Sequence, residues 1–283
     1  MKGEGGKGWD NMKQISIGST TSTFGGPLAT KLKAMSTAGF VATEFWPKDL
    51  FEHPDGPTTA VELLRENGLT VSIYQALRNY EGTPPADRDQ KLGIAEQMMD
   101  QMSLIGCDTL SLPSNSGPDS MGDREKIAAD LARLGDLARS RGMRIAFEPI
   151  CWGRWIKDYR DGWAVVREVN HPNIGLMLDS FHVFLPGSPL TEIADIPGEK
   201  IFVVEVADFA GSALDFIEIS RHYRLFPGEG NSPMEAFLRQ VAKTGYTGCL
   251  SVEVFNAFYR QNDPFDTARR GAACISRVLQ SLG

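Results

Sequence analysis

The sequence predicts a single α/β domain folded as a (β/α)8 TIM barrel, and three observations carry this prediction. Short apolar runs alternate eight times with longer amphipathic stretches, which is the pattern of β–α units around a parallel sheet. The length of 283 residues is close to that of a typical barrel of this kind. No break in composition divides the chain, so we expect one closed barrel from residue 14 to residue 283.

The expected strands are short and rich in β-branched and apolar residues, as buried parallel strands are. In chain order they span residues 14–18, 41–46, 70–75, 109–113, 144–148, 174–179, 201–206 and 250–254. The stretches between them carry apolar residues at helical spacing. Those stretches are residues 28–38, 59–67, 91–105, 124–141, 159–169, 234–244 and 267–282.

Glycine marks most of the expected helix ends. Each of five glycines follows an amphipathic stretch and precedes a strand, where a left-handed C-cap is favoured. These are Gly39, Gly68, Gly106, Gly142 and Gly245. A doubly wound open sheet is the alternative fold, but no glycine-rich phosphate loop follows the first strand, where such folds bind nucleotides.

Three segments stand outside this alternation. Residues 53–58 and 208–232 are longer than ordinary connections, and long loops on a rigid frame often carry function. Residues 1–13 are rich in glycine and lysine without an apolar core, and we interpret them as a flexible leader.

Composition limits the class of protein. The net charge of −7 and the pI near 5.2 argue against a nucleic-acid surface, and no apolar run is long enough for a membrane span. The four cysteines are scattered without a Cys-x-x-Cys pair, which indicates reduced thiols in a cytoplasmic protein rather than a disulfide framework. They are Cys107, Cys151, Cys249 and Cys274.

Acidic residues occupy the ends of the last four expected strands: Glu148, Asp179, Glu205 and Glu253. A single acid at a strand end is more often a helix N-cap or an ion-pair partner. Four that converge at the C-terminal face of a barrel would repel one another, and a divalent cation removes that repulsion. Oxygen ligands favour Mg²⁺ or Mn²⁺, with Co²⁺ as a further candidate.

Histidine and polar residues lie near these acids. His182 follows Asp179 by three residues, and it either orients that ligand or acts as a general acid or base. Other polar residues at this face either bind a small-molecule substrate or stabilise loops, and an arginine among them would suit a carboxylate. These are Gln75, Arg78, Asn115, Arg221 and Arg224.

The pattern of Glu148, Asp179 with His182, Glu205 with Asp208, and Glu253 resembles the xylose isomerase-like sugar phosphate isomerase/epimerase barrels, from about residue 14 onward. Within that superfamily, the chain looks most like 3-dehydroshikimate dehydratases of quinate and shikimate catabolism. The stretches that carry this second resemblance are residues 147–152, 163–170, 175–182, 220–230 and 250–256.

One position departs from the pattern of these families. The third metal ligand is usually His in the superfamily and often Gln in the dehydratases, whereas this chain has Glu205. A further carboxylate there raises the negative charge of the site.

The resemblance implies conversion of 3-dehydroshikimate into protocatechuate and water. One divalent ion would polarise the C3 carbonyl, His182 would remove the adjacent proton, and Arg78, Arg221 or Arg224 would pair with the substrate carboxylate. It also allows a homo-oligomer, because family members often form oligomers.

Two other classes remain open. In a sugar isomerase or epimerase, or a related inosose dehydratase, Glu148 and Glu253 would be both metal ligands and the acid/base pair. A metal-dependent ligand sensor would have the same acids without turnover. A multi-zinc nuclease on this barrel is disfavoured, because it needs more than the four histidines that the chain contains.

Overall fold

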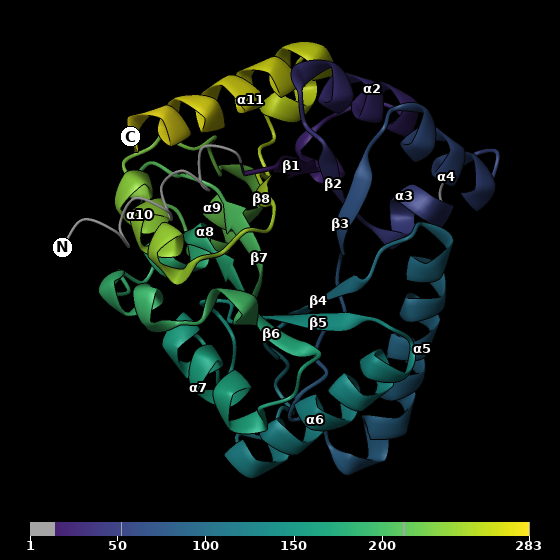
Figure 1. Cartoon of the computed structure of the whole chain (residues 1–283), viewed down its shortest axis with the longest axis vertical. Helices are drawn as coiled ribbons and strands as arrows, with labels where there is room; N and C mark the ends of the chain where they lie inside the picture. Colours follow the sequence, from purple (N-terminus) through teal and green to yellow (C-terminus); the bar gives the residue numbers. More distant parts are fainter. Residues whose placement is uncertain (1–14, 52, 212, 283) are drawn as a thin grey trace.

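The computed structural model describes residues 15–51, 53–211 and 213–282, and it shows a closed barrel of eight parallel strands inside a layer of helices (Figure 1). Each strand pairs with the next one in the sequence, and β8 closes the barrel against β1, where Leu250 lies opposite Ile17. The strands are β1 (Ile17–Thr20), β2 (Ala42–Phe45), β3 (Thr70–Tyr74), β4 (Thr109–Pro113), β5 (Arg144–Glu148), β6 (Ile174–Asp179), β7 (Ile201–Val206) and β8 (Leu250–Val252). The predicted single-domain (β/α)8 barrel is confirmed, and the predicted leader lies outside the described residues.

Helices cover the outside of the barrel, and α2 and α11 lie side by side along it (Figure 1). The described helices are α2 (Leu28–Ala38), α3 (Pro47–Phe51), α4 (Pro57–Glu66), α5 (Arg88–Leu104), α6 (Arg124–Ser140), α7 (Tyr159–Val169), α8 (Ser180–Phe184), α9 (Phe216–His222), α10 (Met234–Thr244) and α11 (Pro264–Ser281). All five predicted helix-ending glycines have positive φ angles, and Gly39 and Gly245 are themselves C-caps. In the part of the chain that is described, no helix is both long and apolar enough to span a bilayer.

The bounds of the first and last strands differ from prediction. β1 starts at Ile17 and continues to Thr20, and β8 ends at Val252. An apolar pattern shows that a strand exists, but only the pairing register, here Ile17 to Ser19 against Leu250 to Val252, fixes where it stops. The short helices α3, α8 and α9 were not predicted, because five to seven residues are too few to show helical spacing.

The interior of the barrel is filled rather than open. Ile73, Ala146, Met177 and Val203 point inward from β3, β5, β6 and β7 and form their own buried cluster. A much larger cluster packs between the outer face of the strands and the helices. Because side chains plug the barrel, a ligand site must lie at one end of it, where the strands give way to loops.

The long segment between β7 and α10 folds back over that end. The Asp208 carboxylate accepts hydrogen bonds from the backbone N–H groups of Gly228, Gly230 and Ser232, at 3.0–3.1 Å. Asp208 also forms an antiparallel bridge with Leu225. These bonds hold the returning segment in place, and with it the adjacent Arg224.

Candidate metal and active site

Five acidic residues lie at the C-terminal ends of the strands, and all five are buried. Four are the predicted ligands Glu148, Asp179, Glu205 and Glu253, and Asp179 lies directly opposite Glu205 in the β6–β7 register. The fifth, Glu44 at the end of β2, was not predicted. Its signal was an acid inside an apolar run, the same signal that identified the other four.

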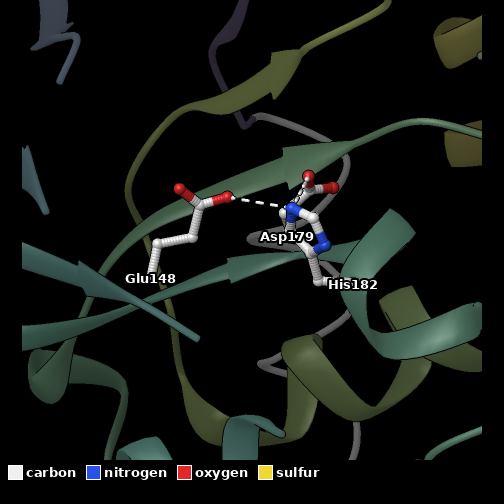
Figure 2. A group of neighbouring side chains, drawn as sticks. All are labelled: Glu148, Asp179 and His182. Carbon is white, nitrogen blue, oxygen red and sulfur yellow. Dashed lines mark ion pairs between the residues drawn. The ribbon is translucent and has the colours of Figure 1, made fainter. Parts of the chain in front are cut away.

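Glu148, Asp179 and His182 form the first of two groups whose ligand atoms lie within 4.8 Å of one another (Figure 2). His182 Nε2 is 3.4 Å from Glu148 Oε1 and 3.6 Å from Asp179 Oδ2. In Figure 2 an oxygen of Glu148 faces a nitrogen of the imidazole ring. The sequence therefore placed the histidine correctly beside the acids, and it contacts two of them.

The orientation of His182 is set by the loop that follows β5. The backbone N–H of Cys151 donates to His182 Nδ1 at 3.3 Å, and the Trp152 ring packs edge-on against the imidazole at 4.7 Å between centroids. Nδ1 accepts from this N–H group when the proton of the neutral imidazole is on Nε2. In the other neutral tautomer Nδ1 donates to Cys151 Sγ, which also lies 3.3 Å away. Burial lowers the pKa of His182 to about 3, which keeps the ring neutral.

Glu44, Glu205 and Glu253 form the second group. Gln75 Nε2 donates to Glu44 Oε2 at 3.0 Å and to Glu205 Oε1 at 2.9 Å, so this predicted substrate ligand is engaged with two acids. Among the described residues, Glu44 Oε1 and Glu205 Oε2 are buried without a hydrogen-bond partner. Buried carboxylate oxygens without donors are costly unless a proton or a cation satisfies them.

Arg224 joins the two groups. Its Nη1 donates to Asp179 Oδ2 at 2.8 Å and to Glu253 Oε2 at 2.9 Å, and the guanidinium lies over the Phe181 ring. Burial alone would lower the pKa of Arg224, but the charges of Asp179 and Glu253 outweigh it and raise that pKa. The sequence offered Arg224 as a substrate ligand or as a cation that offsets the charge of the acids, and the structure places it between two of those acids.

Charge is not balanced within this cluster of five acids. Burial raises the pKa of Glu148 to about 8, with a further contribution from the charge of Asp179, and burial likewise raises the pKa values of Glu44, Glu205 and Glu253. Arg224 supplies one positive charge. Without a further cation the other acids would have to take up protons, as their raised pKa values indicate. A divalent cation with oxygen ligands would take the place of those protons and satisfy the two unpartnered oxygens.

A cavity of about 580 Å³ opens above these residues. Arg78 and Arg221 line it, are exposed, and form no ion pair within the described part of the chain, so they are available to a ligand. The other predicted residues that line the cavity are Gln75, Glu148, His182, Arg224 and Glu253.

Asn115 does not line this cavity. Its side chain donates to the backbone oxygen of Glu81 at 2.7 Å and accepts from the N–H of Gly117, and its own N–H donates to Glu81 Oε1. Of the two roles considered for Asn115, these contacts match loop stabilisation. They also bury Glu81, whose Oε2 has no partner among the described residues.

Glu81 makes the stability of the protein depend on pH. Burial raises its pKa to about 8, above the unfolded value near 4.5, so its contribution is complete below pH 4.5 and is lost as the pH rises toward 8. Glu81→Gln mimics the protonated acid, and we expect it to be more stable than the wild type at pH 8 by roughly 2–5 kcal/mol and nearly equal at pH 4.5. Denaturant unfolding at both pH values measures this.

The control for this prediction is Glu62→Gln, which changes an exposed residue in the middle of α4. Its difference from the wild type is expected to stay within about 0.5 kcal/mol at both pH values. A Glu81→Gln variant with the same pH dependence as the wild type would contradict the assignment of a raised pKa to Glu81.

Named relatives share most of this chain. A 3-dehydroshikimate dehydratase of Pseudomonas putida is 39% identical over 241 residues, which are 85% of this chain and 38% of the relative. One from Neurospora crassa is 23% identical and covers 91% of this chain and 90% of its own length. The chain thus spans less than half the length of the bacterial relative.

A solved structure shows the same arrangement. It is described as a xylose isomerase-like TIM barrel/4-hydroxyphenylpyruvate dioxygenase fusion protein, and it superposes with a TM-score of 0.92 at 34% identity. The match covers 95% of this chain and 43% of that one. Residues 32–278 also match the family described as xylose isomerase-like TIM barrel. Eight closed strands, acids at their C-terminal ends and this match together show that the chain belongs to the xylose isomerase-like TIM barrel family.

Proposed function

We propose that this chain is a metal-dependent 3-dehydroshikimate dehydratase, which converts 3-dehydroshikimate into protocatechuate and water. The observation that carries the proposal is the pairing of Nε2 of the neutral His182 ring with the Glu148 carboxyl at 3.4 Å, where both line the central cavity. A dehydration needs one group to take a proton from carbon and another to protonate the departing hydroxyl. The similarity to named dehydratases supports the same reaction.

The metal would be held by Glu148, Asp179, Glu205 and Glu253. The first two lie in one group with His182, and the last two lie in the other with Glu44, which would be an additional oxygen ligand. Oxygen ligands favour Mg²⁺ or Mn²⁺, with Co²⁺ as the third candidate. When bound, such an ion supplies Lewis acidity, which stabilises negative charge on the substrate carbonyl oxygen.

Proton transfer is assigned to His182 and Glu148. A neutral imidazole acts as a base, so His182 accepts at Nε2 the proton from the carbon beside the carbonyl, in the tautomer whose Nδ1–H faces Cys151 Sγ. Glu148, whose pKa burial raises to about 8, protonates the departing hydroxyl. His182 then passes the proton to the Glu148 carboxylate across the 3.4 Å gap, which restores both residues.

Arg78 and Arg221 would bind the substrate carboxylate, since both face the cavity and neither is paired with a protein acid among the described residues. Arg224 is less suited to that role, because Asp179 and Glu253 already occupy its Nη1.

The decisive experiment is a turnover assay after chelation. We expect the chelated protein to lose at least 90% of its activity on 3-dehydroshikimate (about tenfold or more), and Mn²⁺ or Mg²⁺ to restore it. Appearance of the aromatic product, followed by its ultraviolet absorbance, measures the rate. Full activity in the thoroughly chelated protein would remove the metal from the proposal.

A sugar isomerase or epimerase is the second candidate, because Glu148 and Glu253 face the same cavity and can act as an acid/base pair. Such an enzyme forms no aromatic product from 3-dehydroshikimate. Turnover of keto-sugars without any ultraviolet signal from 3-dehydroshikimate would favour it over the dehydratase.

A further inference from the structure

Three cations lie on the side of the barrel formed by β1, β2 and β8, and the proposed reaction uses none of them. Lys48 of α3 and Arg260 of the 3₁₀ turn Tyr259–Gln261 line the central cavity. Lys48 also lines a second cavity of about 600 Å³, together with Lys31 of α2. Lys48 therefore belongs to the walls of both cavities.

The ammonium group of Lys48 is held against the cavity wall. Its Nζ donates to the hydroxyl of the buried Ser22 at 3.1 Å and lies 5.7 Å from the centre of the Trp46 ring. The indole N–H of Trp46 in turn donates to Thr20 Oγ1 at 2.9 Å. Although much of its side chain is exposed, Lys48 thus presents its charge at a fixed place.

These positive charges have no acid at ion-pair distance among the described residues. Lys31 and Arg260 are half-buried, and neither they nor Lys48 form an ion pair within residues 15–51, 53–211 and 213–282. Burial lowers the pKa of Lys31, Asp49 opposes this, and the charges of Lys48 and Arg260 lower it further.

The nearest acid, Asp49, offsets this charge only in part, because it forms no ion pair with any of the three cations. The Asp49 carboxylate accepts from Thr21 Oγ1 at 2.5 Å and from the N–H of Trp46 at 3.2 Å, and burial raises its pKa. Asp55 and His53 also line the second cavity, but Asp55 is exposed and pairs with none of the three cations. Placing like charges close together and partly out of water costs free energy, and a bound anion would reduce that cost.

We propose that Lys31, Lys48 and Arg260 form a subsite for the oxyanion group of a small-molecule ligand, either a carboxylate or a phosphate monoester. Ammonium and guanidinium groups are the side chains that bind such groups best. A ligand anchored there reaches the central cavity directly, because Lys48 and Arg260 line that cavity as well. The subsite is separate from Arg78 and Arg221, and the inference does not depend on the dehydratase reaction.

Calorimetric titration with inorganic phosphate and with benzoate tests this in the full chain at constant ionic strength. We expect Lys48→Gln and Arg260→Gln each to weaken binding of the preferred anion about tenfold, the loss expected from one charge-assisted hydrogen bond. Tighter binding of phosphate identifies a phosphate ester as the natural group, and tighter binding of benzoate identifies a carboxylate. The matched control is Lys33→Gln, an exposed lysine on the same helix as Lys31, which should bind like the wild type.

Equal affinity in all four proteins, or no saturable binding by the wild type, would overturn the subsite. So would phosphate binding that disappears on chelation but is unchanged by Lys48→Gln, because it would then belong to the metal. If 3-dehydroshikimate is turned over, Lys48→Gln is expected to leave its KM and kcat unchanged, because Arg78 and Arg221 are proposed to bind its single carboxylate. Absence of turnover would reject the dehydratase and leave the anion titration to decide the subsite alone.

Discussion

His182→Gln is expected to lower kcat for 3-dehydroshikimate by about 10²–10⁴-fold, the usual contribution of a general acid or base. A glutamine amide can still donate a hydrogen bond toward Glu148, but it cannot release and recover a proton. The substitution therefore keeps a hydrogen bond that can position Glu148 and removes only the proton transfer by residue 182. Steady-state kinetics under saturating Mn²⁺ measure the effect.

Metal content and fold serve as controls for this variant. Because the proposed ligands are carboxylates, His182→Gln should bind the same amount of metal as the wild type, as measured by elemental analysis, and should unfold at a similar temperature. His182→Ala should lose activity to the same extent. Undiminished kcat in either variant would exclude His182 from the mechanism.

Arg224→Met is expected to destabilise the chelated protein by about 3–5 kcal/mol, because it removes one partner of a buried ion-pair network and leaves two carboxylates unpaired. Arg224 is 2% exposed, and Asp179 and Glu253 both accept from its Nη1. Methionine fills a similar length without charge. Denaturant unfolding in the presence of a chelator measures the change.

Arg221→Met is the matched control, because Arg221 is exposed three residues away and forms no ion pair among the described residues. Its stability should stay within about 0.5 kcal/mol of the wild type. Adding Mn²⁺ should recover part of the loss in Arg224→Met, since a dication can replace the missing charge. Equal stability of the two variants under chelation would contradict the central place given to Arg224.

The barrel could be predicted from the sequence because its signal repeats. Each strand is an apolar run, and each of the five helix-ending glycines sits where its helix stops, so local patterns agree with the global fold. The strand ends also identified four of the five clustered acids. Glu44 carries the same signal in the apolar run of β2 but lies apart in the chain from the four consecutive strands that carry the other acids.

The two carboxylates that Arg224 contacts could not be predicted from the sequence. This arginine lies in the long segment between β7 and α10, where no periodicity fixes the path of the backbone. Its position between Asp179 and Glu253 depends on the bonds that Asp208 makes to Gly228 and Gly230, which are contacts across twenty or more residues. The role of Asn115 could not be predicted either, because its hydrogen-bond partner Glu81 lies in a different loop.

Closure of the barrel determines when the acids first meet during synthesis. Ser19 Oγ donates to the backbone oxygen of Val252, across 233 positions of the chain. Glu253 therefore reaches Asp179 only after β8 has inserted between β7 and β1, so the nascent chain lacks a complete set of ligands until residues 250–253 have emerged. A dication that binds only the closed barrel would stabilise the folded state against unfolding. At a free metal concentration a hundred times the Kd, this stabilisation would be about 2.7 kcal/mol.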